Sequence, residues 1–151
     1  MTREMKQIFT RRITQANRTQ LIVILYDMTL TYLKDATVAQ EIGCDQEYKK
    51  AVQCARNCIS ELRNSLDFAY DLSKNLFALY IFADRELAAN RIQDVVKMFK
   101  KLRDAYQTVS KKDDSKPLMQ NTQDVYAGFT YGRTDVNENL MNYSSARGYC
   151  V

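Results

Sequence analysis

The chain has 151 residues, 46% of them hydrophobic and 26% charged, a balance typical of one soluble domain large enough to bury a core. Its formal net charge is +4, and because 22 basic residues are interleaved with 18 acidic ones, we expect no nucleic-acid-binding surface. No segment has the roughly 20 successive apolar residues of a membrane span, and the amino terminus lacks the apolar run of a secretory signal. We therefore expect a cytoplasmic protein that does not insert into membranes.

Few residues in the chain favour turns, since it holds only 4 glycines and 1 proline. Strand-type alternation of apolar and polar residues is almost absent, whereas apolar residues recur at helical steps of three and four. The pattern therefore predicts an all-α fold. We expect an antiparallel four-helix bundle over residues 17–112, preceded by an N-terminal arm and followed by an irregular C-terminal tail.

The N-terminal arm, residues 1–16, carries apolar side chains at helical spacing among arginines and lysines: Met5, Ile8, Phe9 and Ile13. The pattern fits either a short amphipathic helix or an extended cover. Both alternatives leave an apolar side that must be buried. We therefore expect the arm to dock on the rest of the protein.

The first bundle helix, predicted from residue 17 to about residue 41, is the most apolar part of the chain. Asn17 is a suitable N-cap, and Gly43 is a suitable end signal. Two apolar stripes lie side by side on this helix: Leu21, Leu25, Met28 and Tyr32 form one, and Ile22, Tyr26, Thr29 and Leu33 form the other. One stripe can face an internal core, whereas the other needs a further element of the chain or a bound partner.

One charged residue, Asp27, interrupts this apolar helix. Two positions are open for it. Its carboxylate either lies at the solvent edge of the helix or bonds the backbone or an arginine of a partner.

Three further helices are predicted over residues 46–65, 68–89 and 93–112, each with an apolar stripe at bundle spacing. The tail, residues 113–151, is polar and irregular, with scattered aromatic residues such as Tyr126, Phe129 and Tyr131. Two alternatives stay open for this tail. It either folds back over the bundle and competes with a bound partner for exposed apolar surface, or it has no function.

The chemistry that the chain can carry is limited. Histidine is absent, and with it the commonest general base and metal ligand, and no glycine-rich phosphate loop is present. Cys54 and Cys58 lie four residues apart, but their spacing does not match a zinc knuckle, and we interpret them as compact apolar residues. We therefore expect no enzymatic activity, no metal site and no cofactor.

Three segments, read together, resemble the flagellar secretion chaperone FliS family. They are residues 14–27, with Leu25-Tyr26-Asp27; residues 62–80, with Asn75-Leu76 and Leu79-Tyr80; and residues 101–106, with Leu102-Arg103-Asp104-Ala105-Tyr106. The resemblance spans about residues 5–110. It departs from the family pattern at Met28, where glycine is usual, at Arg18, where a helix-starting proline is usual, and at Tyr106, where many members have tryptophan.

The resemblance implies a function without catalysis. Family members are four-helix bundles that bind the disordered C-terminal segment of flagellin, prevent its premature polymerisation and present it to the flagellar type III export gate. The motif positions imply a client-binding set, to which we add Ile22 from the second apolar stripe: Ile22, Leu25, Tyr26, Asp27, Asn75, Leu76, Leu79, Tyr80, Leu102, Arg103 and Tyr106. The arm of the family can cover this surface, which implies a removable lid of Ile8, Phe9 and Ile13.

Two alternatives to this function stay open. The first is a helical adaptor, or a bundle that forms a homodimer through its surplus apolar stripe. The second is a carboxylate-metal enzyme on a bundle scaffold, which the missing histidine disfavours.

Overall fold

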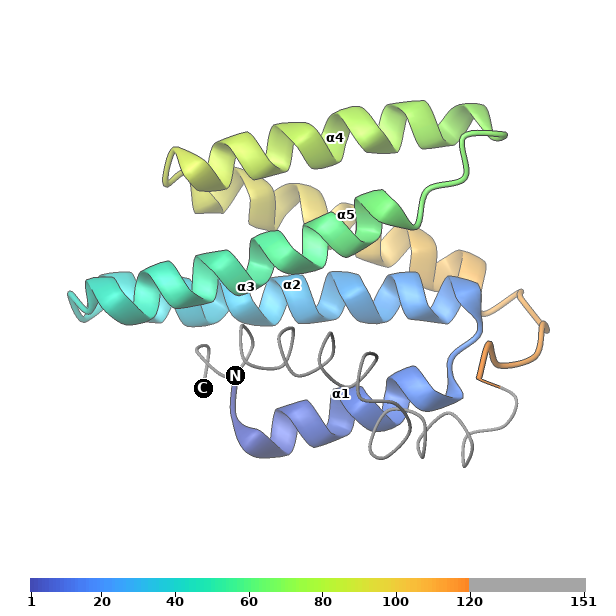
Figure 1. Cartoon of the computed structure of the whole chain (residues 1–151), viewed down its shortest axis with the longest axis horizontal. Helices are drawn as coiled ribbons and strands as arrows, with labels where there is room; N and C mark the ends of the chain where they lie inside the picture. The colour runs from blue at the N-terminus through green and yellow to red at the C-terminus, as the bar shows by residue number, and fades with distance from the viewer. Residues whose placement is uncertain (120–151) are drawn as a thin grey trace, which may run out of the picture.

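The computed structural model describes residues 1–119, and this part of the chain is all-helical, as predicted (Figure 1). Its helices are α1 (Arg3–Gln15), α2 (Arg18–Glu41), α3 (Asp45–Asn64), α4 (Asp71–Ala88) and α5 (Ile92–Ser110). Helices α2 to α5 run alternately up and down, which confirms the antiparallel bundle (Figure 1). The predicted tail begins irregularly, because residues 113–119 contain no helix, and the aromatic residues of the tail hypothesis lie outside the described residues.

The helix ends follow local chemistry. Asn17 caps α2 as predicted: its side chain accepts from the backbone N–H of Gln20 at 2.9 Å, and the Gln20 side chain accepts from the Asn17 N–H at 3.0 Å. Gly43 follows α2 with a φ of 74°, a left-handed conformation that glycine adopts without strain. Helix α4 begins three residues later than predicted, because the chain turns at Asp67, whose backbone carbonyl accepts from the Ser73 hydroxyl at 2.6 Å.

Helix α2 is the centre of the molecule, since α1, α3 and α5 all pack against it. Both of its predicted stripes are buried: Leu25, Met28 and Tyr32 belong to one, and Tyr26, Thr29 and Leu33 to the other. Helix α4 packs on α3 and α5 and closes the bundle. The apolar surface that four helices leave uncovered on α2 is therefore partly covered by a fifth, α1, which lies on the outer side of the bundle (Figure 1).

A group of aromatic side chains joins α2, α4 and α5 inside the bundle. The hydroxyls of Tyr26 and Tyr80 are 2.5 Å apart, and the ring of Phe99 meets the Tyr26 ring edge-on at 5.4 Å between centroids. Tyr26 is 0% exposed. Burial raises the pKa of Tyr80 to about 12 and raises the pKa of Tyr26 well above its ordinary value. Both phenols are therefore held in their neutral, hydrogen-bonded form.

A short strap after α5, residues 113–118, crosses the connection between α1 and α2. The buried side chain of Asn17 donates to the backbone carbonyls of Asp113 and Ser115, each at 3.2 Å. The Leu118 N–H donates to the carbonyl of Ala16 at 3.0 Å. Hydrogen bonds from Ser115 and from Thr19 lower the pKa of the Asp113 carboxyl. The strap therefore holds the backbone of the connection between α1 and α2 in place.

Candidate functional site

A groove of about 560 Å³ runs between α1, α2 and α5. Its lining combines apolar side chains with charged ones. The apolar residues are Met5, Phe9, Leu30, Val38 and Val96, and the charged residues are Arg12, Asp27, Lys34, Glu41, Lys100 and Arg103.

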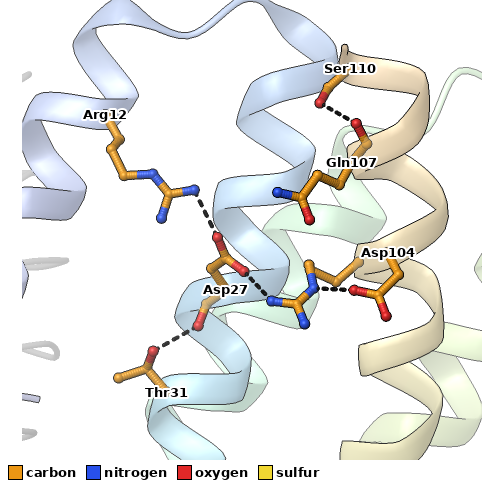
Figure 2. Close-up of polar contacts among 7 residues, drawn as sticks. Arg12, Asp27, Thr31, Asp104, Gln107 and Ser110 are labelled. Atoms are coloured by element: carbon orange, nitrogen blue, oxygen red, sulfur yellow. Dashed lines mark hydrogen bonds and ion pairs between the residues drawn. The ribbon is translucent and has the colours of Figure 1, made fainter.

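The carboxylate of Asp27 ties the three helices of this groove together (Figure 2). Arg12 of α1 donates from Nη2 to Asp27 Oδ2 at 2.7 Å, and Arg103 of α5 donates from Nη1 to Oδ1 at 3.2 Å. Arg103 also donates from Nε to Asp104 at 2.6 Å, and this hydrogen bond is the main reason that the pKa of its guanidinium is raised. The Asp27 carboxylate therefore lies at the groove edge and bonds arginines of its own chain, whereas its bonding to a partner stays a prediction.

Helix α1 lies in the predicted N-terminal arm and forms one wall of the groove. Of the two alternatives for the arm, the amphipathic helix is the one observed. Phe9 is 4% exposed, and Ile13 packs partly buried against the same core. Ile8 is 51% exposed and faces away from the bundle. The guanidinium of Arg12 lies over the Phe9 ring, 5.4 Å from its centroid. The face of α1 that covers the bundle is therefore formed by Met5, Phe9, Arg12 and Ile13.

Helix α1 is incompletely packed against the bundle. Besides the groove, a cavity of about 330 Å³ lies toward the end of α1 and is also lined by Arg12, and one of about 220 Å³ lies on its other side, beside Phe9 and Ile13. Burial of one phenylalanine contributes about 1.5–3 kcal/mol. The Arg12–Asp27 pair, with side chains 40% and 21% exposed, adds only about 0.2–1 kcal/mol. Contacts of this size can be displaced by a ligand that makes similar ones.

The structure distributes the predicted client-binding residues over four environments. Only Asp27 and Arg103 line the groove. Four others are buried in the core in this conformation: Leu25, Tyr26, Leu76 and Tyr80. Half-buried positions are taken by Ile22, Leu79, Leu102 and Tyr106, and Asn75 is exposed on α4. The motif residues of α4 are thus not brought together with the groove, which α1, α2 and α5 form.

Several groove residues were missed by the sequence reasoning, above all Arg12. A signal for it exists, because Arg12 follows Phe9 by three residues and Met5 by seven, and therefore lies on the apolar face of the arm helix. A cation on an apolar face indicates a specific anionic partner. Leu30, Lys34, Val96 and Lys100 gave no such signal, because each fits an ordinary bundle helix.

A second apolar area is exposed at the start and along the outer side of α4. The rings of Phe68 and Phe77 contact each other edge-on with centroids 5.7 Å apart, and both side chains are exposed. Leu72 and Phe82 are exposed on the same helix. None of these residues lines the groove.

Within residues 1–119, no three cysteine, aspartate or glutamate side chains are grouped so as to hold a metal ion. Cys54 and Cys58 are buried among apolar neighbours in the core. The interpretation of both as compact apolar residues is wrong for Cys54, because Cys54 is disulfide-bonded. None of the helices in this same range combines the length and the apolarity needed to cross a membrane.

The fold and the site define an antiparallel helical bundle whose groove is partly covered by the amphipathic N-terminal helix of the same chain. Comparison with known families makes the class specific, since residues 1–113 match the family described as flagellar protein FliS. The chain therefore belongs to the FliS family, a family of flagellar chaperones, and the resemblance seen in the sequence is confirmed. Among proteins with curated descriptions, none matches this chain.

Proposed function

We propose that this protein is a cytoplasmic export chaperone that captures the disordered C-terminal segment of flagellin, prevents its premature polymerisation and delivers it to the flagellar export gate. The observation that carries the proposal is the docking of α1, because an amphipathic helix of the chain itself already lies against the groove. Family membership supports the flagellar role.

Binding would begin with displacement of α1. The N-terminal segment docks through the buried Phe9, the partly buried Met5 and Ile13, and two ion pairs, Arg12–Asp27 and that of the amino terminus with Asp35. A client helix with comparable contacts can compete with it. Ordering a disordered client segment costs conformational entropy. The affinity of the client therefore depends on how much apolar area it buries beyond the area that α1 buries. No catalytic group is required for this function.

The predicted client-binding residues have different roles in this proposal. Asp27 and Arg103 contact the client directly, and the half-buried Ile22, Leu79, Leu102 and Tyr106 lie where the client can extend along the bundle. Tyr26 and Tyr80 support the bundle from within, because a client could reach them only if α2 and α4 separated.

The test is isothermal titration calorimetry of the full chain with the C-terminal segment of the organism's own flagellin. We expect saturable one-to-one binding with a negative heat-capacity change, as apolar burial requires. Flagellin lacking this segment is the control and should not bind. Equal binding of both flagellins would contradict the assignment of the client segment.

A second candidate function, a self-dimerising adaptor, is favoured by the exposed aromatic pair of Phe68 and Phe77. Exposed rings of this kind mark protein interfaces when they cluster. Light scattering at increasing concentration distinguishes the candidates: dimerisation that Phe77→Ser abolishes would support the adaptor, and a monomer at all concentrations would exclude it.

A further inference from the structure

We infer that the Asp27 carboxylate is the cation anchor of the groove, and that the client helix presents a lysine or arginine there, in the place that Arg12 takes in the closed state. The inference rests on the proposed function and adds the chemistry by which the client is recognised. A docked client should carry apolar residues three and seven positions before this cation.

The spacing comes from α1, which serves as an internal template for the client. Met5, Phe9 and Arg12 all line the groove, at steps of four and three that place them on one helical face. Phe9 is the buried anchor of this face, and Arg12, one turn further, reaches Asp27 at 2.7 Å. A client helix that replaces α1 in the same orientation meets the same apolar surface and the same carboxylate.

The electrostatics of Asp27 make it ready to accept a new cation. When α1 leaves, Oδ2 loses its hydrogen bond from Arg12, whereas Oδ1 keeps the one from Arg103. Arg103 cannot supply the missing bond without cost, since it also donates to Asp104. The Asp27 side chain is 21% exposed with α1 in place, and departure of α1 leaves Oδ2 open to a new donor. A lysine or arginine of the client restores the pair.

The other charges of the groove limit where a client cation can lie. Without Arg12 the lining keeps three cations, Lys34, Lys100 and Arg103, and two carboxylates, Asp27 and Glu41. A basic residue placed between Lys34 and Lys100 is repelled, whereas one placed at Asp27 is attracted. The charge pattern therefore selects the position of the client helix along the groove as well as its composition.

The test compares Arg12→Gln with the double variant Arg12→Gln/Asp27→Asn, so that the closed-state pair is absent from both proteins. Titrated with the C-terminal segment of the organism's flagellin, Arg12→Gln should bind at least as tightly as the unaltered chain. The double variant should bind about two- to fivefold more weakly than Arg12→Gln, the range of one half-exposed ion pair. High salt should reduce this difference.

Substitutions in the client identify the partner of Asp27. Each basic residue of the flagellin segment is changed to Gln in turn, and one of these changes should weaken binding to Arg12→Gln two- to fivefold while leaving binding to the double variant unchanged. The titrations of the client variants with Arg12→Gln do not use an Asp27→Asn protein, so they identify the sensitive basic residue whatever the stability of the double variant. The matched control is Arg56→Gln/Asp84→Asn, which removes a bidentate pair of similar exposure between α3 and α4 and should not change client affinity.

The outcomes separate this inference from the proposed function. Equal affinities of Arg12→Gln and the double variant, or no sensitive basic residue in the client, would overturn the cation anchor while the chaperone function stands. An Asp27→Asn effect that is the same for every client variant would also overturn it, because it would indicate a purely structural role. Loss of flagellin binding in all proteins, including the unaltered chain, would instead reject the proposed function.

Discussion

Arg12 of α1 and Asp27 of α2 form a 2.7 Å ion pair at the edge of the groove, and this pair joins the N-terminal helix to the bundle. Most of the docking energy comes from elsewhere, since burial of Phe9 contributes about 1.5–3 kcal/mol and the half-exposed pair about 0.2–1 kcal/mol. Apolar contacts hold α1, and the charges position it. Such a division suits a cover that a client has to displace.

Phe9→Ser should release α1 from the bundle, because it removes the one buried side chain of this helix. A loss of about 1.5–3 kcal/mol raises the uncovered population roughly tenfold or more. Hydrogen exchange of the α1 amides should accelerate accordingly, and flagellin should bind more tightly. Ile8→Ser is the matched control, because Ile8 is exposed on the same helix. Similar exchange rates in the two variants would contradict the assignment of Phe9 as the anchor.

Asn17→Ala should destabilise the protein, since one buried side chain both caps α2 and donates to the carbonyls of Asp113 and Ser115. Loss of an N-cap costs about 0.5–2 kcal/mol, and the carbonyls of Asp113 and Ser115 also lose their donor. We expect a decrease of about 1–3 kcal/mol in the free energy of unfolding, measured by urea denaturation. Asn64→Ala, an exposed change at the end of α3, should alter it by less than about 0.5 kcal/mol.

Substitutions of Tyr26 and Tyr80, whose hydroxyls meet in the core, should have non-additive effects on the free energy of unfolding. Tyr26→Phe leaves the buried hydroxyl of Tyr80 without this partner and should cost about 1–3 kcal/mol. Tyr26→Phe/Tyr80→Phe removes both hydroxyls and should cost less than the sum of the two single changes. Urea denaturation of the three variants completes the double-mutant cycle. Additive losses would show that the 2.5 Å contact contributes no coupling.

Alkaline pH should destabilise the folded state because the phenol pKa values are raised in it. The ordinary value is 10.0, and burial raises the pKa of Tyr80 to about 12 and also raises that of Tyr26. Between pH 10 and 12 the unfolded chain releases these protons while the folded protein keeps them, so the free energy of unfolding falls as pH rises. The limiting slope is about 1.4 kcal/mol per pH unit for each tyrosine.

Denaturation at pH 8, 10 and 11 measures this slope, which should be smaller in Tyr26→Phe/Tyr80→Phe than in the unaltered chain. Tyr70→Phe serves as the control, because Tyr70 is exposed and its replacement should leave the slope unchanged. A slope independent of the core tyrosines would contradict their role in alkaline unfolding.

Much of the fold follows from local patterns. The apolar period of α2, its cap at Asn17 and its end at Gly43 are short-range features, and the structure bears out all three. The helix boundary at Phe68 was wrong by three residues, because the turn depends on Asp67 and its bond to Ser73, which apolar periodicity does not report. The surplus apolar surface of α2 was also foreseen, although its cover by α1 was only one of two open alternatives.

The sequence by itself determined the helices, their order and the family to which the chain belongs, because these depend on spacing along the chain and on motifs such as Leu25-Tyr26-Asp27. Only the tertiary structure decided which motif residues are accessible. Tyr26 and Asp27 are neighbours in sequence, yet a rotation of about 100° per residue in a helix sends one into the core and the other to the groove. The partner of Asp27 likewise depends on how α1 folds back, since Arg12 and Arg103 lie far from it along the chain and meet it only when three helices pack together.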